Sequence, residues 1–254
     1  MRPAWISACM FILSAGMLCG QTRDDDDVVA RGDTAFFRMD YAGAEQIYER
    51  GLRADSLNTD LLWRQARVLV CDGEVEQEAA RAMECFRSAE LMARQCAALD
   101  STRPEGHTWR AAALGYLALD TALAVQVKLT QELKRETDMA IALDSTDDAA
   151  YSIRGSMYRA LGNVSWFQRQ LAAIFLGRIP AGGREEAEAD LRKAMRLAPR
   201  VMRHPYELGM LYRDWGRMEE AASMLRIAMS LPVQVAIDIP RLKKIRELLS
   251  TGTD

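Results

Sequence analysis

The stretch that decides the fold runs from Gly209 to Pro232 and reads GMLYRDWGRMEEAASMLRIAMSLP. Tyr212 follows the glycine at an offset of three residues, and small, apolar and turn residues stand at offsets 12, 16, 19 and 23, namely Ala221, Leu225, Ala228 and Pro232. A small residue where two helices cross lets their backbones approach closely, and a proline cannot continue the second helix. The stretch therefore predicts two antiparallel helices packed at short range.

The same offsets occur twice more in the chain. Gly32 is followed at offsets 12, 16 and 19 by Ala44, Tyr48 and Gly51. Gly155 opens a third copy whose second helix, with Ala187, Leu191, Ala194 and Pro199, is displaced by an insertion of 20 residues. A period of 34 residues is the tetratricopeptide signature, and units of this kind must stack to bury their apolar faces. We therefore expect an all-α, right-handed α-solenoid of about five tetratricopeptide-like helix pairs over residues 28–254, with an insertion at 163–183.

The middle of the repeat region is less regular than its ends. A long second helix is expected over residues 79–98, ending at Leu99-Asp100, and another ends with residues 139–144. Pro104 is expected to begin the third unit, and the phrase Ala-Leu-Asp-Ser occurs at both 98–101 and 142–145. A last helix over 239–249 would cap the stack, because a terminal repeat needs cover for its apolar face. The first and fifth units fit the spacing best, and the second and third fit it least well.

Residues 1–20 have the pattern of a secretory signal peptide. Arg2 precedes an apolar core, and Cys19-Gly20 precedes Gln21, so we place cleavage after Gly20. Residues 21–27 form an acidic linker that contains four consecutive aspartates. The pattern predicts an exported, periplasmic protein. A lipoprotein and an uncleaved membrane anchor through residues 1–20 are the alternatives.

Composition and motifs argue against several classes of function. The chain has 33 basic and 36 acidic residues, so no basic excess indicates nucleic-acid binding. The two histidines and the scattered cysteines have no metal-ligand spacing, and no nucleophile, phosphate-loop or zinc-protease motif occurs. We therefore predict a protein that is not an enzyme and that uses no cofactor and no metal.

The insertion carries the phrase Trp166-Phe167-Gln168-Arg169, which is followed by an apolar stretch and a Pro/Gly turn. With His107, Trp109, Gly115 and the closing unit over 199–231, this phrase resembles the regulator of microtubule dynamics family and its bacterial tetratricopeptide relatives, over roughly residues 60–250. The resemblance implies a helical, non-enzymatic protein. It also implies links to microtubules, to organelle contact sites or to phospholipid held in the superhelix. An exported chain meets no microtubule, so partner binding and lipid binding remain.

Seven residues are candidates for ligand or partner binding. They are His107 and Trp109 at a helix start on the concave side, Tyr151 and Arg154 one helical turn apart, and Trp166, Phe167 and Arg169 in the insertion. Each has a structural alternative, because an aromatic stripe also plugs a core and a buried arginine also pairs with a carboxylate. Arg200 and Arg203, ahead of the fifth unit, are expected to be solvated.

Two functions of different class follow from this. The first is an exported interaction scaffold whose concave face binds a protein or peptide that the sequence does not identify. The alternative is a carrier of an apolar ligand such as a phospholipid, enclosed by the lengthened central helices. A continuous apolar cavity between helices would favour the carrier, and a wide polar groove would favour the scaffold. The sequence carries no signal of oligomeric state.

Overall fold

The computed structural model describes residues 27–163 and 180–250, and every regular element in these ranges is a helix. The first helix covers residues 27–37. The helices that follow are α2 (Tyr41–Ala54), α3 (Thr59–Gly73), α4 (Ala79–Leu99), α5 (Pro104–Leu117), α6 (Leu123–Leu143), α7 (Asp148–Gly162), α9 (Arg184–Leu197), α10 (Arg203–Asp214), α11 (Met218–Met229) and α12 (Asp238–Ser250).

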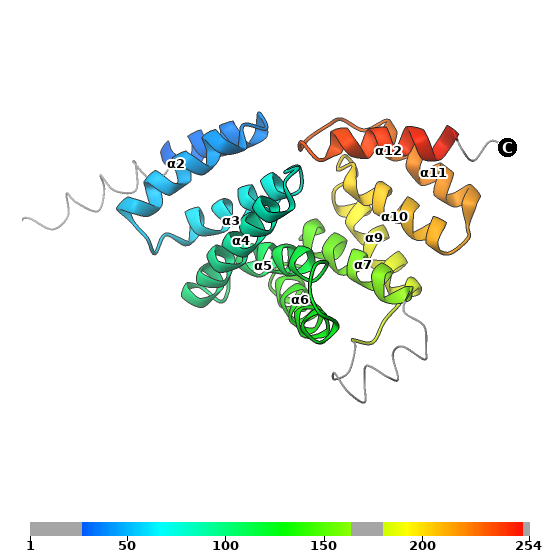
Figure 1. Cartoon of the computed structure of the whole chain (residues 1–254), viewed down its shortest axis with the longest axis horizontal. Coiled ribbons are helices and arrows are strands. Elements are labelled where there is room, and N and C mark those ends of the chain that lie inside the picture. The colour runs from blue at the N-terminus through cyan, green and yellow to red at the C-terminus, as the bar shows by residue number, and fades with distance from the viewer. Residues whose placement is uncertain (1–26, 164–179, 251–254) are drawn as a thin grey trace, which may run out of the picture.

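The described helices pack as consecutive pairs. Residues 27–37 pair with α2, α3 with α4, α5 with α6, α7 with α9 and α10 with α11, and α12 follows the last pair. Figure 1 shows the pairs along an arc, with α2 and α12 at its two ends. The prediction of an all-α stack of five tetratricopeptide-like pairs closed by a further helix is confirmed.

Glycines lie where paired helices touch. A Cβ atom added to Gly32 would lie 2.1 Å from Cε1 of Tyr48, whose side chain is fully buried. A methyl group cannot fit at that distance, so only glycine allows this approach of the two helices. The corresponding contacts in the fourth and fifth pairs are Gly155 with Leu191 Cγ at 2.7 Å and Gly209 with Leu225 Cγ at 2.9 Å.

The repeated Ala-Leu-Asp-Ser phrase forms the same turn at the end of both long helices. Oδ1 of Asp100 accepts a hydrogen bond from the backbone N–H of Thr102 at 3.0 Å, and Asp144 accepts one from Thr146 at 2.8 Å. Aspartate bonded to the backbone two residues on mimics a turn and ends the helix before it. This local chemistry explains why the ends of α4 and α6 could be predicted within one residue.

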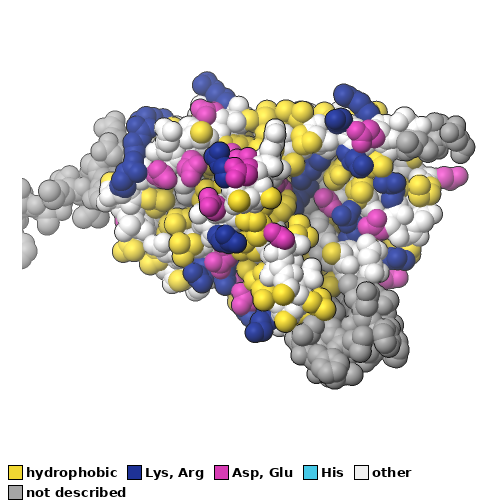
Figure 2. Space-filling model, viewed as in Figure 1, with side chains coloured by type: hydrophobic (Ala, Val, Ile, Leu, Met, Phe, Trp, Pro, Cys, Tyr) yellow, Lys and Arg dark blue, Asp and Glu magenta, His cyan; other side chains and the backbone are white. Residues whose placement is uncertain are grey.

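The two ends of the arc meet. The segment between α11 and α12 places Val235 and Ala236 against the core of the first pair, which includes Phe36 and Tyr41. The backbone N–H of Ala236 donates a hydrogen bond to the Tyr41 hydroxyl at 2.9 Å. Residues 195 positions apart in sequence are thereby joined, and the C-terminal segment bridges the arc (Figure 1). Figure 2 shows a hollow between the two arms, with basic side chains visible inside it.

None of the described helices has the length and apolar character that crossing a bilayer requires.

Candidate binding cavity

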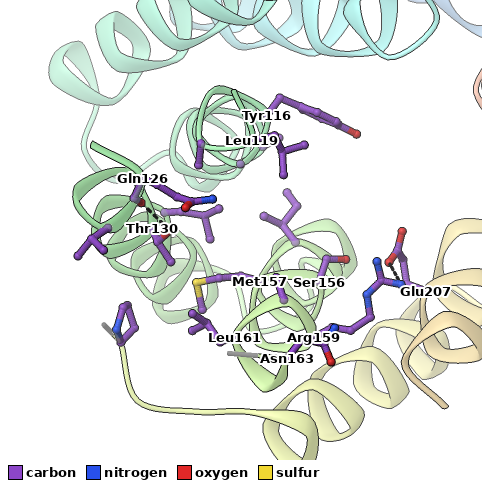
Figure 3. A pocket seen from close by; sticks show the side chains of 18 of the residues that line it. Tyr116, Leu119, Gln126, Thr130, Ser156, Met157, Arg159, Leu161, Asn163 and Glu207 are labelled. Atoms are coloured by element: carbon purple, nitrogen blue, oxygen red, sulfur yellow. Dashed lines mark hydrogen bonds and ion pairs between the residues drawn. The ribbon is translucent and has the colours of Figure 1, made fainter. Parts of the chain in front are cut away.

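A cavity of about 700 Å³ lies inside the arc, between the third and fourth helix pairs. Figure 3 shows the side chains that surround it, which come from α5 and α6 on one side and from α7 and α10 on the other. This volume falls in the range of cavities that hold small organic ligands, which is about 300–1,000 Å³.

The walls of the cavity are mainly apolar. Leu119 of the turn after α5 contributes to them, as do Leu123, Val127 and Leu133 of α6 and Ile153, Met157 and Leu161 of α7. Val127, Leu133 and Ile153 are buried in the fold, yet each has one side against the cavity rather than against a neighbouring side chain. A wall of this kind suits an aliphatic chain, because burying apolar surface is the main favourable term in such binding.

The cavity exists because the third pair is held at one end and open at the other. At the closed end Glu136 of α6 accepts hydrogen bonds from Arg110 at 2.6 Å and from Nδ1 of His107 at 2.7 Å. Arg110 also bonds Glu90 of α4 at 3.1 Å. We call these four residues the polar clamp.

At the open end of the third pair the helix contact is loose. A Cβ atom added to Gly115 would meet only Cδ1 of Leu133, at 3.3 Å. Both residues line the cavity, so the space between α5 and α6 widens in the direction away from the polar clamp.

The inner end of the cavity is polar. Arg159 lies 3.6 Å from Oε2 of Glu207 and 3.8 Å from Oδ2 of Asp214, and both distances exceed a hydrogen bond. Nη1 of Arg159 and Oε2 of Glu207 are shielded from solvent without a hydrogen-bond partner in the described residues. Figure 3 shows Arg159 and Glu207 side by side at this end, with Ser156 on the same helix as Arg159.

Arg203 is the second cation of the inner end. Its Nε is buried without a hydrogen-bond partner among the described residues, and so is Oγ of Ser156. Burial opposes the charge of Arg203, but the nearby Tyr116, Glu74 and Glu207 outweigh it and raise the pKa of this side chain above its usual value. The expectation that Arg203 is solvated was wrong, because the start of α10 faces the interior of the arc and not the solvent. Arg200, three residues earlier, is exposed.

A further polar layer connects the inner end to the C-terminal segment. The Tyr116 hydroxyl donates a hydrogen bond to Oε1 of Glu74, and the guanidinium of Arg241 lies 3.7 Å from the same oxygen. Arg241 also donates to Asp238 at 3.0 Å. Burial, followed by the charge of Glu74, raises the pKa of Tyr116, so the hydroxyl keeps its proton. The segment that closes the arc is therefore tied by charge to the wall of the cavity.

The four predicted site residues that the structure describes lie outside the cavity. His107 belongs to the polar clamp, and Trp109 packs against the central core cluster. Tyr151 and Arg154 do lie together, since the guanidinium stands 5.6 Å from the ring centre. Trp166, Phe167 and Arg169 lie outside the described residues.

Arg154 is held by carboxylates and not presented to a ligand. Its Nε and Nη2 donate to the two oxygens of Asp190 at 2.7 and 2.9 Å, and its Nη1 donates to Asp138 at 2.8 Å. A bidentate arginine–carboxylate pair is among the strongest polar contacts in proteins. In the sequence the structural alternative for Arg154 was ion pairing, and the geometry agrees with that alternative.

Sequence reasoning missed the residues of the inner end. One weak signal existed, because Arg203 and Glu207 are four residues apart and Arg159 follows Gly155 by the same interval. That spacing places side chains on one helix face. It does not tell whether the face meets solvent or a cavity. Among the described residues no group of three or more His, Cys, Asp or Glu side chains is arranged to hold a metal ion.

The sequence matches known proteins along most of its length. A family model described as "Regulator of microtubule dynamics protein 1-3" matches residues 28–252. Regulator of microtubule dynamics protein 2 of Rattus norvegicus is 25% identical over 147 residues, which are 57% of this chain and 35% of the relative. Protein 3 of the same organism is 24% identical over 217 residues, 82% of this chain and 46% of the relative. The chain thus spans less than half the length of these curated relatives.

The fold also matches solved structures. A thermophilic tetratricopeptide protein of Thermus thermophilus superposes with a TM-score of 0.67 at 17% sequence identity, covering 89% of this chain and 99% of that one. At this identity the likeness concerns the fold alone, and it supports the tetratricopeptide-like assignment. Since the family model covers nearly the whole described region, the chain belongs to the regulator of microtubule dynamics protein 1-3 family.

Proposed function

We propose that this protein is a non-enzymatic binding protein that carries an apolar chain in the cavity between α5, α6 and α7. The observation behind the proposal is the cavity itself: about 700 Å³ with aliphatic walls and a polar inner end. The apolar walls of a cavity of this size leave water and gain dispersion contacts when an apolar molecule fills it. A bound aliphatic chain would supply those contacts.

The inner end suggests that the carried molecule is an amphiphile. Arg203 and Ser156 offer hydrogen-bond donors that no described residue uses. A polar head placed there would satisfy them, because a buried donor without a partner costs free energy that a ligand can recover. A fatty acid, or one chain of a phospholipid, has the required combination of a polar head and an aliphatic tail.

A protein-binding scaffold is the second candidate. Stacked helical pairs present an extended surface, and repeat proteins commonly use such surfaces to bind other proteins. The contact between the C-terminal segment and the first pair occupies part of the concave side, so we place this function second. Crosslinking in cells tests it. The capture of one specific protein through residues of the concave face would favour the scaffold function over the carrier function.

We also propose that the protein is exported through residues 1–20. Its support is the signal-like pattern in the sequence. N-terminal sequencing of the protein from a periplasmic fraction should give Gln21 as the first residue. Protein that stays in the membrane fraction with residues 1–20 attached would indicate an anchor instead.

The carrier proposal can be tested by filling the cavity. Thr130 lines it from α6 and is half-buried, so Thr130→Trp would place an indole in the space without disturbing a packed core. Lys128→Trp is the matched control, because Lys128 is exposed on the same helix and does not line the cavity. The binding of cis-parinaric acid, a fluorescent fatty acid, is measured by titration for the wild type and both variants.

We expect the wild type and Lys128→Trp to bind the probe with similar affinity and Thr130→Trp to lose about tenfold or more. Native mass spectrometry of detergent-free protein should show a co-purified amphiphile in the first two proteins only. Equal binding by all three proteins would mean that the probe does not enter this cavity, and no binding by the wild type would refute the carrier function.

A further inference from the structure

The turn between α5 and α6, together with the first three residues of α6, forms an exposed apolar surface. Residues 119–125, Leu-Asp-Thr-Ala-Leu-Ala-Val, are all exposed and contain a single charge, that of Asp120. Leu119 is 75% exposed, Leu123 57% and Val125 44%. We call this segment the apolar tip. Three large aliphatic side chains in seven exposed residues form a local patch of the kind that marks an interaction site.

The apolar tip is continuous with the cavity. Leu119 and Leu123 belong to both, since they line the cavity and are exposed to solvent at the same time. Figure 3 shows Leu119 at the side of the cavity formed by α5 and α6. The polar inner end with Arg203 and Glu207 lies at the other side. The cavity therefore opens at the tip, through a rim that has the same chemistry as its walls.

We propose that the apolar tip docks on a lipid bilayer and that the carried chain passes between bilayer and cavity across this rim. The inference rests on the proposed carrier function and adds the surface from which the cargo is taken. The exposed side chains of the tip surround the mouth of an apolar cavity, so a bilayer at this position would meet the cavity directly. The tip's near absence of charge fits the hydrocarbon boundary of a bilayer better than a charged protein surface.

The physical reason for such a contact is the cargo's low solubility. Each methylene group moved into water costs about 0.8 kcal/mol, so an aliphatic chain leaves a bilayer slowly on its own. A rim that touches the bilayer lets the chain move from one apolar environment to another without full exposure to water. Delivery then requires a collision between protein and vesicle, and its rate rises with vesicle concentration.

The decisive experiment measures contact at the tip directly. A tryptophan placed in the tip by Ala122→Trp should be quenched by vesicles of brominated phosphatidylcholine, because bromine atoms quench only indoles within the bilayer. Leu57→Trp, in the exposed turn between α2 and α3, is the control and should not be quenched. The full chain is used throughout, so any contribution from residues 1–20 is common to both variants.

A second pair of variants tests the role in transfer. Ala124→Asp with Val125→Asp changes two exposed tip residues that do not line the cavity. It should slow the delivery of cis-parinaric acid from protein to phosphatidylcholine vesicles by about tenfold, because charge opposes insertion. Leu57→Asp with Met218→Asp changes two exposed apolar residues remote from the cavity and should leave the rate unchanged. Both double variants should retain the wild-type affinity for dissolved probe.

The outcomes separate this inference from the carrier function. If the wild type binds dissolved probe but the tip indole is not quenched, the bilayer contact is refuted while the cavity keeps its function. If the wild type does not bind the probe, the carrier function fails first and the inference fails with it. Shielding of the tip indole in the absence of vesicles, together with a dimeric mass, would assign the tip to a second copy of the chain and also refute docking on a bilayer.

Discussion

The first and third helix pairs place a glycine on the first helix of each pair but leave different amounts of room beside it. At Gly32 an added Cβ would lie 2.1 Å from the buried Tyr48 ring, whereas at Gly115 it would meet only a leucine methyl group at 3.3 Å. The first pair follows the repeat spacing closely, and the third, with its long second helix, does not. In these two pairs regular spacing goes with dense packing, and the departure from it goes with the cavity.

One fold thus serves two purposes within a single chain. The dense pairs supply stability, because close contact of large side chains across the helices maximises dispersion and excludes water. The open pair gives up some of these contacts and is held by the polar clamp at its far end. We expect the two kinds of pair to respond differently to the same substitution.

The largest difference is expected for leucine-to-alanine changes. Leu191 is fully buried against Gly155 in the fourth pair, which is as dense as the first, so Leu191→Ala should lower the free energy of unfolding by about 4 kcal/mol. Leu133 of the third pair already borders empty space, so Leu133→Ala should cost about 2 kcal/mol. Urea denaturation monitored by circular dichroism measures both. Equal losses would show that the cavity wall is packed as tightly as the dense pairs.

The next effect is expected at the two glycines of the comparison. Gly32→Ala inserts a methyl group into the Tyr48 ring, and Tyr48 is also fixed by a hydrogen bond of 2.8 Å to Asp33, so we expect a loss of about 2 kcal/mol. Gly115→Ala meets a flexible methyl group and gains helix propensity, so its effect should lie between zero and a gain of about 1 kcal/mol. Thermal and urea unfolding of the two variants measure these changes in stability. A larger loss for Gly115→Ala than for Gly32→Ala would show that the third pair has less room beside its glycine than the first.

The fold could be predicted from the sequence because its determinants are local. Glycine and alanine offsets marked the helix crossings, Pro104 marked the start of α5, and an aspartate turn ended each long helix. The contact between Ala236 and Tyr41 could not be predicted in this way. It joins residues 195 positions apart, and no periodic pattern extends over that distance.

The site could not be predicted because its residues look ordinary in sequence. Leu133 and Ile153 occupy apolar positions at helical spacing, and such positions read the same whether they face a partner or a cavity. Arg154 and Arg203 are both helical arginines in the second half of the chain, yet only the three-dimensional fold brings Asp190 to the first and leaves the Nε of the second without a partner among the described residues. A side chain's partners in space are not encoded in its own neighbourhood in sequence.

A smaller effect is expected on ligand affinity at the polar end of the open pair's cavity. Arg203→Met removes the positive charge and keeps most of the aliphatic volume, so the affinity for a long-chain fatty acid should fall by about tenfold, or 1.4 kcal/mol. The affinity for the alcohol of the same chain length should change little. Arg200→Met is the control, because Arg200 is exposed. Isothermal titration of both ligands measures the difference, and an equal loss for acid and alcohol would place the head group elsewhere.

The smallest effect concerns the polar clamp that holds the third pair. The hydrogen bond to Glu136 raises the pKa of His107 above its ordinary 6.5, against the opposing effect of burial and of Arg110. A histidine whose pKa is raised by folding contributes stability that is complete below its unfolded pKa and is lost as the pH rises through the folded pKa. Glu136, whose pKa is lowered in the fold, stays ionised throughout this interval and adds no slope there.

His107→Gln should therefore cost about 1 kcal/mol at pH 5.5 and less at pH 8.5, since glutamine keeps a hydrogen-bond donor but not the charge. Urea unfolding of the wild type and the variant at the two pH values measures the difference. The first pair offers the contrast, because its polar contact joins Asp33 to Arg64 and Arg67 and contains no histidine. A cost of His107→Gln that is independent of pH would mean that the neutral imidazole holds α5 to α6, and that the open pair is fastened by hydrogen bonding without charge.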